Sequence, residues 1–161
     1  MMKKILCLLA VLLMLTAGCT PKPPEPLTFT EADFSVTLTD AFEKSSADGL
    51  VYHYVSKDAL LLVTMDDFSL FETAGVATDI TLEEYAQIAI DTNKLGSTVD
   101  TDAAGNVYFT YTRAAGGDSF YYYAVVKRSE KGFWLCQFAC DAADAETLSA
   151  QFAEWGASIA V

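Results

Sequence analysis

The sequence predicts an α+β domain, in which helices cover the faces of an antiparallel sheet of about six strands. Three observations lead to this class. β-rich segments are separated by short turns, two segments have helical periodicity, and two strand segments near the C-terminus are apolar at adjacent positions. Adjacent apolar residues indicate a sheet that is covered on both faces. Residues 27–161 are enough for one such domain and too few for two.

The first strand segments are a single strand followed by a hairpin. Residues 34–39 alternate between apolar and hydroxyl side chains, which is the period-2 pattern of a half-buried strand. Residues 50–56 and 59–65 are two β-rich runs separated only by Lys57 and Asp58. So short a polar separation predicts a tight hairpin.

A helix is predicted over residues 82–94, after a connection at residues 66–80 that has no clear periodicity. Thr81 and Glu84 match a capping box, in which each side chain bonds to the other residue's backbone. Gly96 lies where such a helix would end. The apolar residues at helical spacing are Leu82, Tyr85, Ala86 and Ala89.

The second half of the domain predicts a strand meander and a final helix. Its strand segments, joined by glycine-containing turns that favour antiparallel pairing, are 97–102, which is the weakest, 107–113, 119–128 and 133–140. The helix is predicted over residues 145–158, with Asp141 or Asp144 as its N-cap. One apolar stripe along it consists of Leu148, Phe152, Trp155 and Ile159.

This order of elements resembles the PsbP/Mog1-like fold. Small bacterial lipoproteins of that kind often open on an F-x-V-x-L strand, and Phe34, Val36 and Leu38 match it here. The proline that usually follows is absent, and Asp40 and Ala41 occupy that region. The resemblance implies a binding or assembly module without a shared catalytic centre. A cystatin-like α+β arrangement is the alternative fold.

The N-terminal segment resembles a bacterial lipoprotein signal. Lys3 and Lys4 precede an apolar run at residues 5–15, and Thr16-Ala17-Gly18-Cys19 follows. The run is too short for a membrane-spanning helix, which needs roughly 20 residues. The resemblance implies that residues 1–18 are removed between Gly18 and Cys19, and that Cys19 carries fatty acids such as palmitate. An ordinary secretory signal cut near Ala17 is the alternative.

Residues 19–26 are predicted to be a lipidated, proline-rich tether. They contain all four prolines of the chain, which favour extended geometry. At about 3.1 Å per residue, such a segment reaches roughly 25 Å. Two or three acyl chains on Cys19 would hold the chain durably, since each buried methylene contributes about 0.8 kcal/mol. We therefore expect a location on the extracytoplasmic face of the cell membrane, although an outer-membrane destination stays open.

The charge of the chain limits its partners. It has 22 acidic and 10 basic residues, for a net charge of −12. The negative electrostatic field of such a charge repels nucleic acid and anionic lipid headgroups. The expected partners are therefore the membrane, through the lipid on Cys19, and a protein of the cell envelope, with no nucleic acid.

No catalytic residue, metal ligand or cofactor is predicted. His53 is the only histidine, and no G-x-S-x-G motif accompanies it. Cys136 and Cys140 would lie about 13 Å apart on one strand, too far for a disulfide, so two buried thiols are expected. A disulfide formed where the strand ends is the alternative. Residues 100–105 begin like a calcium loop but lack later ligands, which predicts a hairpin turn.

A weak partner-binding patch is predicted in the 66–80 connection, because connections of this length are often functional. Two phenylalanines rimmed by acids could dock a basic or apolar partner. In the alternative, both rings fill the edge of the sheet. The patch consists of Asp66, Asp67, Phe68, Phe71 and Glu72.

Together these features predict a membrane-anchored extracytoplasmic lipoprotein that acts as a binding or assembly module rather than as an enzyme. A small envelope hydrolase with paired carboxylates is one alternative, and it requires a carboxyl group with a raised pKa. A module that captures a solute or an ion is another, and it requires a concave pocket of ligand size.

Overall fold

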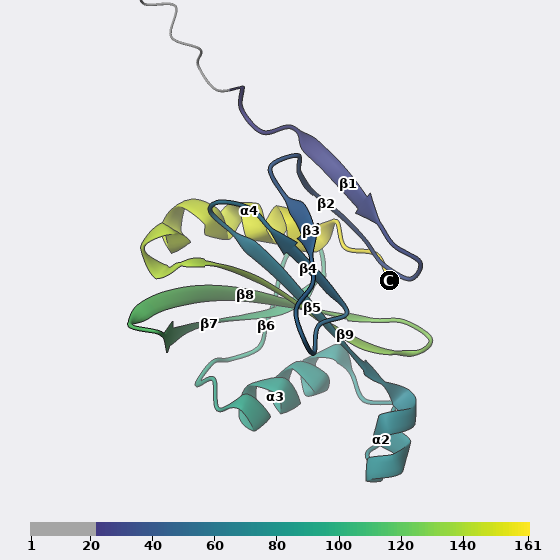
Figure 1. The fold of residues 1–161 in the computed structure, drawn as a ribbon. Helices are drawn as coiled ribbons and strands as arrows, with labels where there is room; N and C mark the ends of the chain where they lie inside the picture. The colour runs from purple at the N-terminus through teal and green to yellow at the C-terminus, as the bar shows by residue number, and fades with distance from the viewer. Residues whose placement is uncertain (1–21) are drawn as a thin grey trace, which may run out of the picture.

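The computed structural model describes residues 22–161, whose strands form two antiparallel sheets (Figure 1). Gly18 and Cys19, the predicted cleavage and lipidation residues, lie outside the described residues, as does most of the predicted tether. Among residues 22–161, no helix combines the length and the apolar character needed to cross a bilayer.

The main sheet has seven strands in the order β3-β4-β5-β9-β8-β7-β6. Each neighbouring pair is antiparallel, which confirms the α+β class and the predicted meander. The strands are β3 (Glu43–Ser45), β4 (Tyr52–Val55), β5 (Leu60–Asp67), β6 (Asp100–Thr101), β7 (Val107–Ala115), β8 (Asp118–Arg128) and β9 (Gly132–Asp141). The sheet exceeds the predicted six strands because β3 is a three-residue edge strand with no buried side chain, so it has no apolar signal.

A second sheet pairs β1 (Pro26–Thr30) with β2 (Ser35–Thr39). β2 is the predicted opening strand, and its Val36 and Leu38 are buried. β1 was not predicted, because none of its residues is buried and it therefore lacks a period-2 pattern. It begins at Pro26, so this last residue of the predicted tether belongs to the folded body.

The helices lie on opposite faces of the main sheet, as predicted (Figure 1). α4 (Ala145–Ala157) covers one face together with the small sheet, and α3 (Leu82–Asn93) covers part of the other. α2 (Phe68–Ala74) is a short helix inside the connection that follows β5. A 3-10 turn, η1 (Ala142–Asp144), precedes α4.

The helix ends agree with the sequence at α3 and differ in detail elsewhere. The capping box of Thr81 and Glu84 is present, with bonds of 3.1 and 2.8 Å. Lys94 is the left-handed C-cap of α3, and Gly96 takes a left-handed conformation two residues later, so the helix ends at Asn93, just before the predicted end. Of the two candidate caps before α4, Asp141 accepts from the Ala143 amide and caps η1, whereas the Asp144 side chain makes no cap bond.

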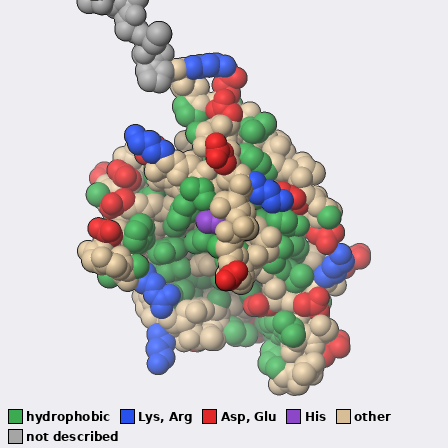
Figure 2. All heavy atoms as spheres, viewed as in Figure 1, with side chains coloured by type: hydrophobic (Ala, Val, Ile, Leu, Met, Phe, Trp, Pro, Cys, Tyr) green, Lys and Arg blue, Asp and Glu red, His purple; other side chains and the backbone are tan. Residues whose placement is uncertain are grey.

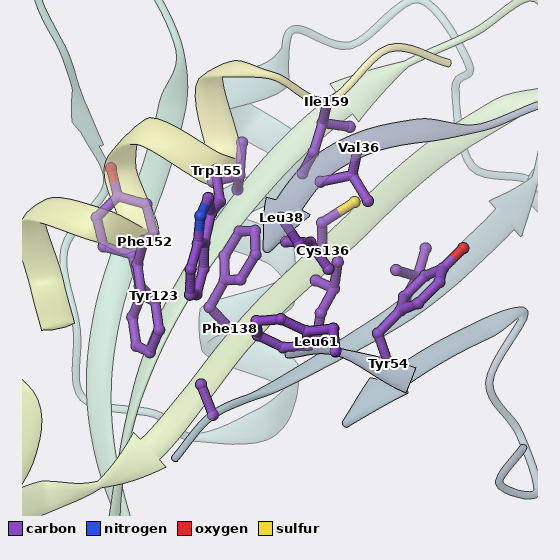
Figure 3. Close-up of a cluster of buried hydrophobic side chains, with 14 of the residues drawn as sticks. Val36, Leu38, Tyr54, Leu61, Tyr123, Cys136, Phe138, Phe152, Trp155 and Ile159 are labelled. Atoms are coloured by element: carbon purple, nitrogen blue, oxygen red, sulfur yellow. The ribbon is translucent and has the colours of Figure 1, made fainter. Parts of the chain in front are cut away.

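The larger core lies between the main sheet, α4 and β2 (Figure 3). The predicted stripe of α4 supplies Phe152, Trp155 and Ile159 to it. Phe138 of β9 packs against the rings of Phe152 and Trp155, with centroids 5.5 and 5.9 Å away. This core fixes the small sheet and α4 on one side, so the opposite side of the sheet is left to α3, to the short helix α2 and to the segments next to them.

α3 covers only part of that opposite face. Its Tyr85 and Ile90 pack over buried residues of β7, β8 and β9. Further along the same face, away from α3, side chains are only partly buried. They include His53, Val55, Leu60, Leu62 and Tyr122. Figure 2 shows the histidine beside a group of hydrophobic side chains. The sequence predicted a face covered by helices, whereas the twelve residues of α3 leave this end of the sheet partly open.

Two ion pairs join the loop between β1 and β2 to the main sheet, Asp33 with Lys131 of the turn between β8 and β9 and Glu31 with Lys44 of β3. Glu31 Oε1 accepts from Lys44 Nζ at 2.6 Å and from the Tyr54 hydroxyl at 3.1 Å. The hydrogen bond from Lys44 lowers the pKa of Glu31 from its ordinary value of 4.5, against a smaller opposing effect of burial. The charged form of Glu31 therefore stabilises the fold.

We expect Glu31→Gln to lower the melting temperature at pH 7 and to lower it by less at pH 3. A lowered folded-state pKa contributes stability above the unfolded pKa, and this contribution disappears as the pH falls through the folded value. Thermal unfolding of both chains at the two pH values measures the difference. Glu43→Gln is the control, since Glu43 is an exposed acid of β3 without an ion pair among the described residues. A Glu31→Gln deficit that is as large at pH 3 would contradict the assignment.

Candidate functional site

A cleft of about 460 Å³ lies beside α3, on the partly covered face of the main sheet. We call it the α3 cleft. Residues of α3 and of the segment after it line one side, and the end of the loop before β4 lines another. Strands β5, β7 and β9 also contribute. The cleft is of the size of a small-ligand site, which usually starts at about 300 Å³.

At one end of the cleft, Tyr85 of α3 meets Asp66 of β5. The capped first turn of α3 places the Tyr85 ring on Phe133, with centroids 4.5 Å apart. Its hydroxyl donates to Asp66 Oδ2 at 2.7 Å. Burial raises the pKa of Tyr85, and the bond to Asp66 adds to this effect. Tyr85 thus remains a protonated donor that holds the carboxylate at the mouth of the cleft.

At the other end, Tyr111 of β7 meets Gln137 of β9. The Tyr111 hydroxyl donates to Gln137 Oε1 at 2.6 Å, and its ring stacks on Tyr122 at 4.6 Å. Burial raises the pKa of Tyr111 to about 12, Tyr122 adds to the rise, and the nearby charge of Arg113 opposes it. The Tyr111 hydroxyl is therefore a donor, and Arg113 lies close to it at the same end.

Arg113 is the only cation among the described residues that line the cleft. Its side chain is exposed, and it makes no ion pair or hydrogen bond within residues 22–161. Two apolar side chains also line the cleft while remaining exposed, namely Ile88 at 43% and Val51 at 45%. The cleft therefore combines an unpaired positive charge, neutral hydrogen-bonding groups and apolar surface.

The structure divides the predicted patch between the cleft and the smaller core. Asp66 and Phe71 line the cleft. Phe68 packs on Phe133 at 5.2 Å, beneath the guanidinium of Arg128. Asp67 instead caps α2 by accepting from the Ser69 amide, and Glu72 is exposed on α2. The two rings of the patch contact each other and the core residue Phe133, and the partner-binding role of the patch stays a prediction.

We expect Phe71→Asp to destabilise the fold by about 2–4 kcal/mol, because it removes ring contacts and places a charge beside buried aromatics. The Phe71 ring lies 5.8 Å from Phe133 and 6.3 Å from Tyr85. Leu70→Asp is the matched control on the same helix turn. Leu70 is 62% exposed, so its replacement should change stability by less than about 0.5 kcal/mol. Urea titration of both variants measures this, and equal losses would show that the ring of Phe71 is not a core contact.

The groups that could perform chemistry are poorly placed for it. Asp66 is the only carboxylate among the described residues that line the cleft. The carboxyls with a clear pKa shift, Glu31, Asp67 and Asp102, all have a lowered pKa, mainly through hydrogen bonds. None of these three provides the proton donor that the hydrolase alternative requires. In residues 22–161, no three His, Cys, Asp or Glu side chains cluster as a metal site.

His53 and the two cysteines are parts of the sheet. Both ring nitrogens of His53 in β4 are buried without a hydrogen bond to the described residues. Cys136 and Cys140 are buried free thiols, as the strand spacing predicts. Burial raises the pKa of Cys136 to about 12 and that of Cys140 to about 11. Neither thiol is therefore ionised enough near neutral pH to act as a nucleophile.

The calcium-like segment is the predicted hairpin turn, between β6 and β7. Asp102 accepts from the backbone amides of Ala104 and Asn106, at 2.9 and 2.8 Å. It also accepts from the Asn106 side chain at 2.8 Å, and Asn106 in turn accepts from Lys127 Nζ at 2.7 Å. The ammonium group of Lys127 thus supplies the positive charge beside this turn.

Sequence reasoning missed most residues of the cleft, including Tyr85 as a donor, Ile88, Tyr111, Arg113 and Gln137. Two signals could have pointed to it. Gln137 interrupts the otherwise apolar run of β9, and Ile88 lies outside the apolar stripe of α3. Neither signal says that the two residues lie near each other, because that depends on where α3 packs.

Solved structures of similar fold are known, whereas no protein-family model and no curated protein matches the chain. Cyanobacterial PsbP (CyanoP) from Synechocystis sp. PCC 6803 aligns over 92% of this chain and 99% of its own, with a TM-score of 0.56 and 11% identity. LpqN, described as involved in cell envelope biogenesis of Mycobacterium tuberculosis, aligns over 86% of this chain and 91% of its own, with a TM-score of 0.51 and 11% identity. A protein from Bacteroides thetaiotaomicron aligns over 84% of this chain and 47% of its own, with a TM-score of 0.52 and 10% identity.

The class defined by these observations is an α+β protein with a PsbP-like fold. This confirms the resemblance on which the sequence interpretation depends and favours it over the cystatin-like alternative. At 10–11% identity, the similarity concerns the fold and not the activity.

Proposed function

We propose that this protein is a lipid-anchored, extracytoplasmic binding module that uses the α3 cleft to hold a component of the cell envelope. The observation that carries the proposal is the cleft itself, in which Arg113, Ile88 and Val51 are all exposed and Arg113 has no ion pair among residues 22–161. Unsatisfied charge next to exposed apolar surface is typical of a binding site.

The direction of the cleft supports an anchored role. The described chain begins at Lys22 and enters β1, which packs with β2 on the α4 side of the main sheet. α3 lies on the other side (Figure 1), and the cleft that it lines is therefore on that side as well. A tether on Cys19 would thus leave the cleft open to the envelope space. The fold of LpqN, which is described as involved in cell envelope biogenesis, agrees with such a location.

Photocrosslinking in intact cells tests this proposal on the full chain. A photoreactive amino acid replaces Ile88 in the cleft, and in a control chain it replaces Leu27 of β1. Both positions are exposed apolar residues, at 43% and 45%, but on opposite sides of the sheet. We expect a discrete adduct, identified by mass spectrometry, at position 88 and none at position 27. Equal adducts at both positions, or none at position 88, would refute the cleft as the binding site.

A further inference from the structure

We infer that the α3 cleft takes a short extended peptide whose free carboxylate is held by Arg113. This inference rests on the proposed binding function and names its ligand class. It depends on three features of the cleft: donors without acceptors at one end, polar groups distributed along its length, and apolar side chains between them.

The carboxylate end is defined by Arg113 and Gln137. Because Gln137 Oε1 accepts from the Tyr111 hydroxyl, the amide NH₂ of Gln137 faces away from that bond. This NH₂ has no acceptor among the described residues, and the guanidinium of Arg113 has none either. A guanidinium binds a carboxylate through two parallel N–H···O bonds. The donor set at this end therefore matches a carboxylate.

The surrounding charge favours an anion with a single charge. The chain as a whole carries −12, and Asp66 lines the other end of the cleft. A phosphate group with nearly two negative charges meets more repulsion from this field than a carboxylate does. At the Asp66 end, the carboxylate can accept from an N–H of the ligand. The cleft thus fits a ligand with an acceptor at one end and donors toward the other.

The polar groups along the cleft favour a peptide over an acyl chain. Its lining includes the hydroxyl-bearing residues Thr64 and Thr92 and the amide-bearing residue Asn93. The Nδ2 atom of Asn93 donates to the Ala89 carbonyl at 2.9 Å, which leaves its Oδ1 free to accept. An acyl chain would bury these groups without partners, which costs about 1–3 kcal/mol for each. A peptide offers an N–H and a C=O at every residue.

The part of the cleft between Asp66 and Gln137 has the length of about four extended residues. Asp66 pairs with Phe133 of β9, and Gln137 lies four positions further along the same strand. At about 3.3 Å per residue, this separation is about 13 Å, and the strand register places Arg113 four positions further along, level with Asp141. Ile88 and Val51 would contact the side chains of the peptide. The segment bound is therefore shorter than a folded partner and suited to a chain end.

Titration of the full chain, purified in detergent, tests this inference by NMR. The probe is an equimolar pool of N-acetylated tetrapeptides, randomised at three positions and ending in alanine with a free carboxylate. The same pool with an amidated C-terminus is the second probe. We expect the first pool to shift the amide signals of Thr92, Asn93 and Gln137, and the amidated pool to bind at least tenfold more weakly. Equal binding of the two pools would overturn the inference.

Two variants and two competing ligands complete the test. Arg113→Gln should weaken binding of the carboxylate pool at least tenfold, whereas Lys57→Gln, which removes an exposed charge outside the cleft, should not. If laurate gave the same signal shifts with equal or higher affinity, the cleft would be assigned to acyl chains. If inorganic phosphate did so, it would be assigned to oxyanions in general. Either result would overturn the inference that the ligand is a peptide. No shift with any probe would also overturn the inference, while the crosslink from position 88 would still support a binding function.

Discussion

Cys19→Ala is expected to abolish the covalent attachment of fatty acid to this protein. The resemblance to a lipoprotein signal makes Cys19 the residue that is lipidated in the mature chain, so its removal should have an all-or-none effect. Cells grown with an alkyne-tagged palmitate analogue provide the measurement, as fluorescence of the immunoprecipitated chain after coupling to a dye. The expected result is strong labelling of the chain with its native Cys19 and no labelling of the variant.

Cys7→Ala is the matched control for this experiment. Cys7 lies within the predicted signal, which is removed before the mature chain is formed, so labelling should persist in this variant. The thiols of Cys136 and Cys140 are buried in β9 and should not take up the label. Label that remains on the Cys19→Ala chain, or the absence of label on the chain with its native Cys19, would exclude the lipid anchor and with it the proposed location.

Phe138→Ala is expected to cost about 3–5 kcal/mol of folding free energy, which is the usual range for a buried phenylalanine. Phe138 has no exposed surface and lies between β9 and the two aromatic rings of α4 (Figure 3). Its removal leaves a cavity that Phe152 and Trp155 can fill only by leaving their own contacts. For a protein of this size, the loss amounts to a fall of roughly 10–20 °C in melting temperature.

Leu27→Ala provides the comparison, because Leu27 is an exposed apolar residue of β1. It should change the free energy of unfolding by less than about 0.5 kcal/mol. Denaturant unfolding of both variants at constant pH gives the two values. A loss below about 1 kcal/mol for Phe138→Ala would mean that α4 does not pack on β9 as described.

The elements themselves were largely predictable because their signals are local. The capping box of Thr81 and Glu84, the stripe of α4 and the glycine-containing turns each lie within a few residues of one another. The exceptions are the exposed strands β1 and β3 and the short helix α2. Their side chains have little or no buried face, and so the pattern that identifies an amphipathic element is missing.

The cleft was not predictable in this way. It exists because β9 pairs with β5, although these strands are far apart in the sequence, and because α3 covers only one end of the resulting face. The sequence predicted Asp66 and Phe71 as members of a binding patch, but it did not predict their neighbours in the cleft. Arg113 has no local feature that distinguishes it from any other exposed cation.

The sequence by itself determined the PsbP-like α+β class, most strands and helices, and the expectation of an anchored envelope protein. The tertiary structure alone decided which side chains share the α3 cleft and which exposed groups there have no partner. The physical reason is that periodicity and capping depend on residues next to one another in the chain. The shape and charge of a cleft depend on strand pairing and helix placement between distant segments.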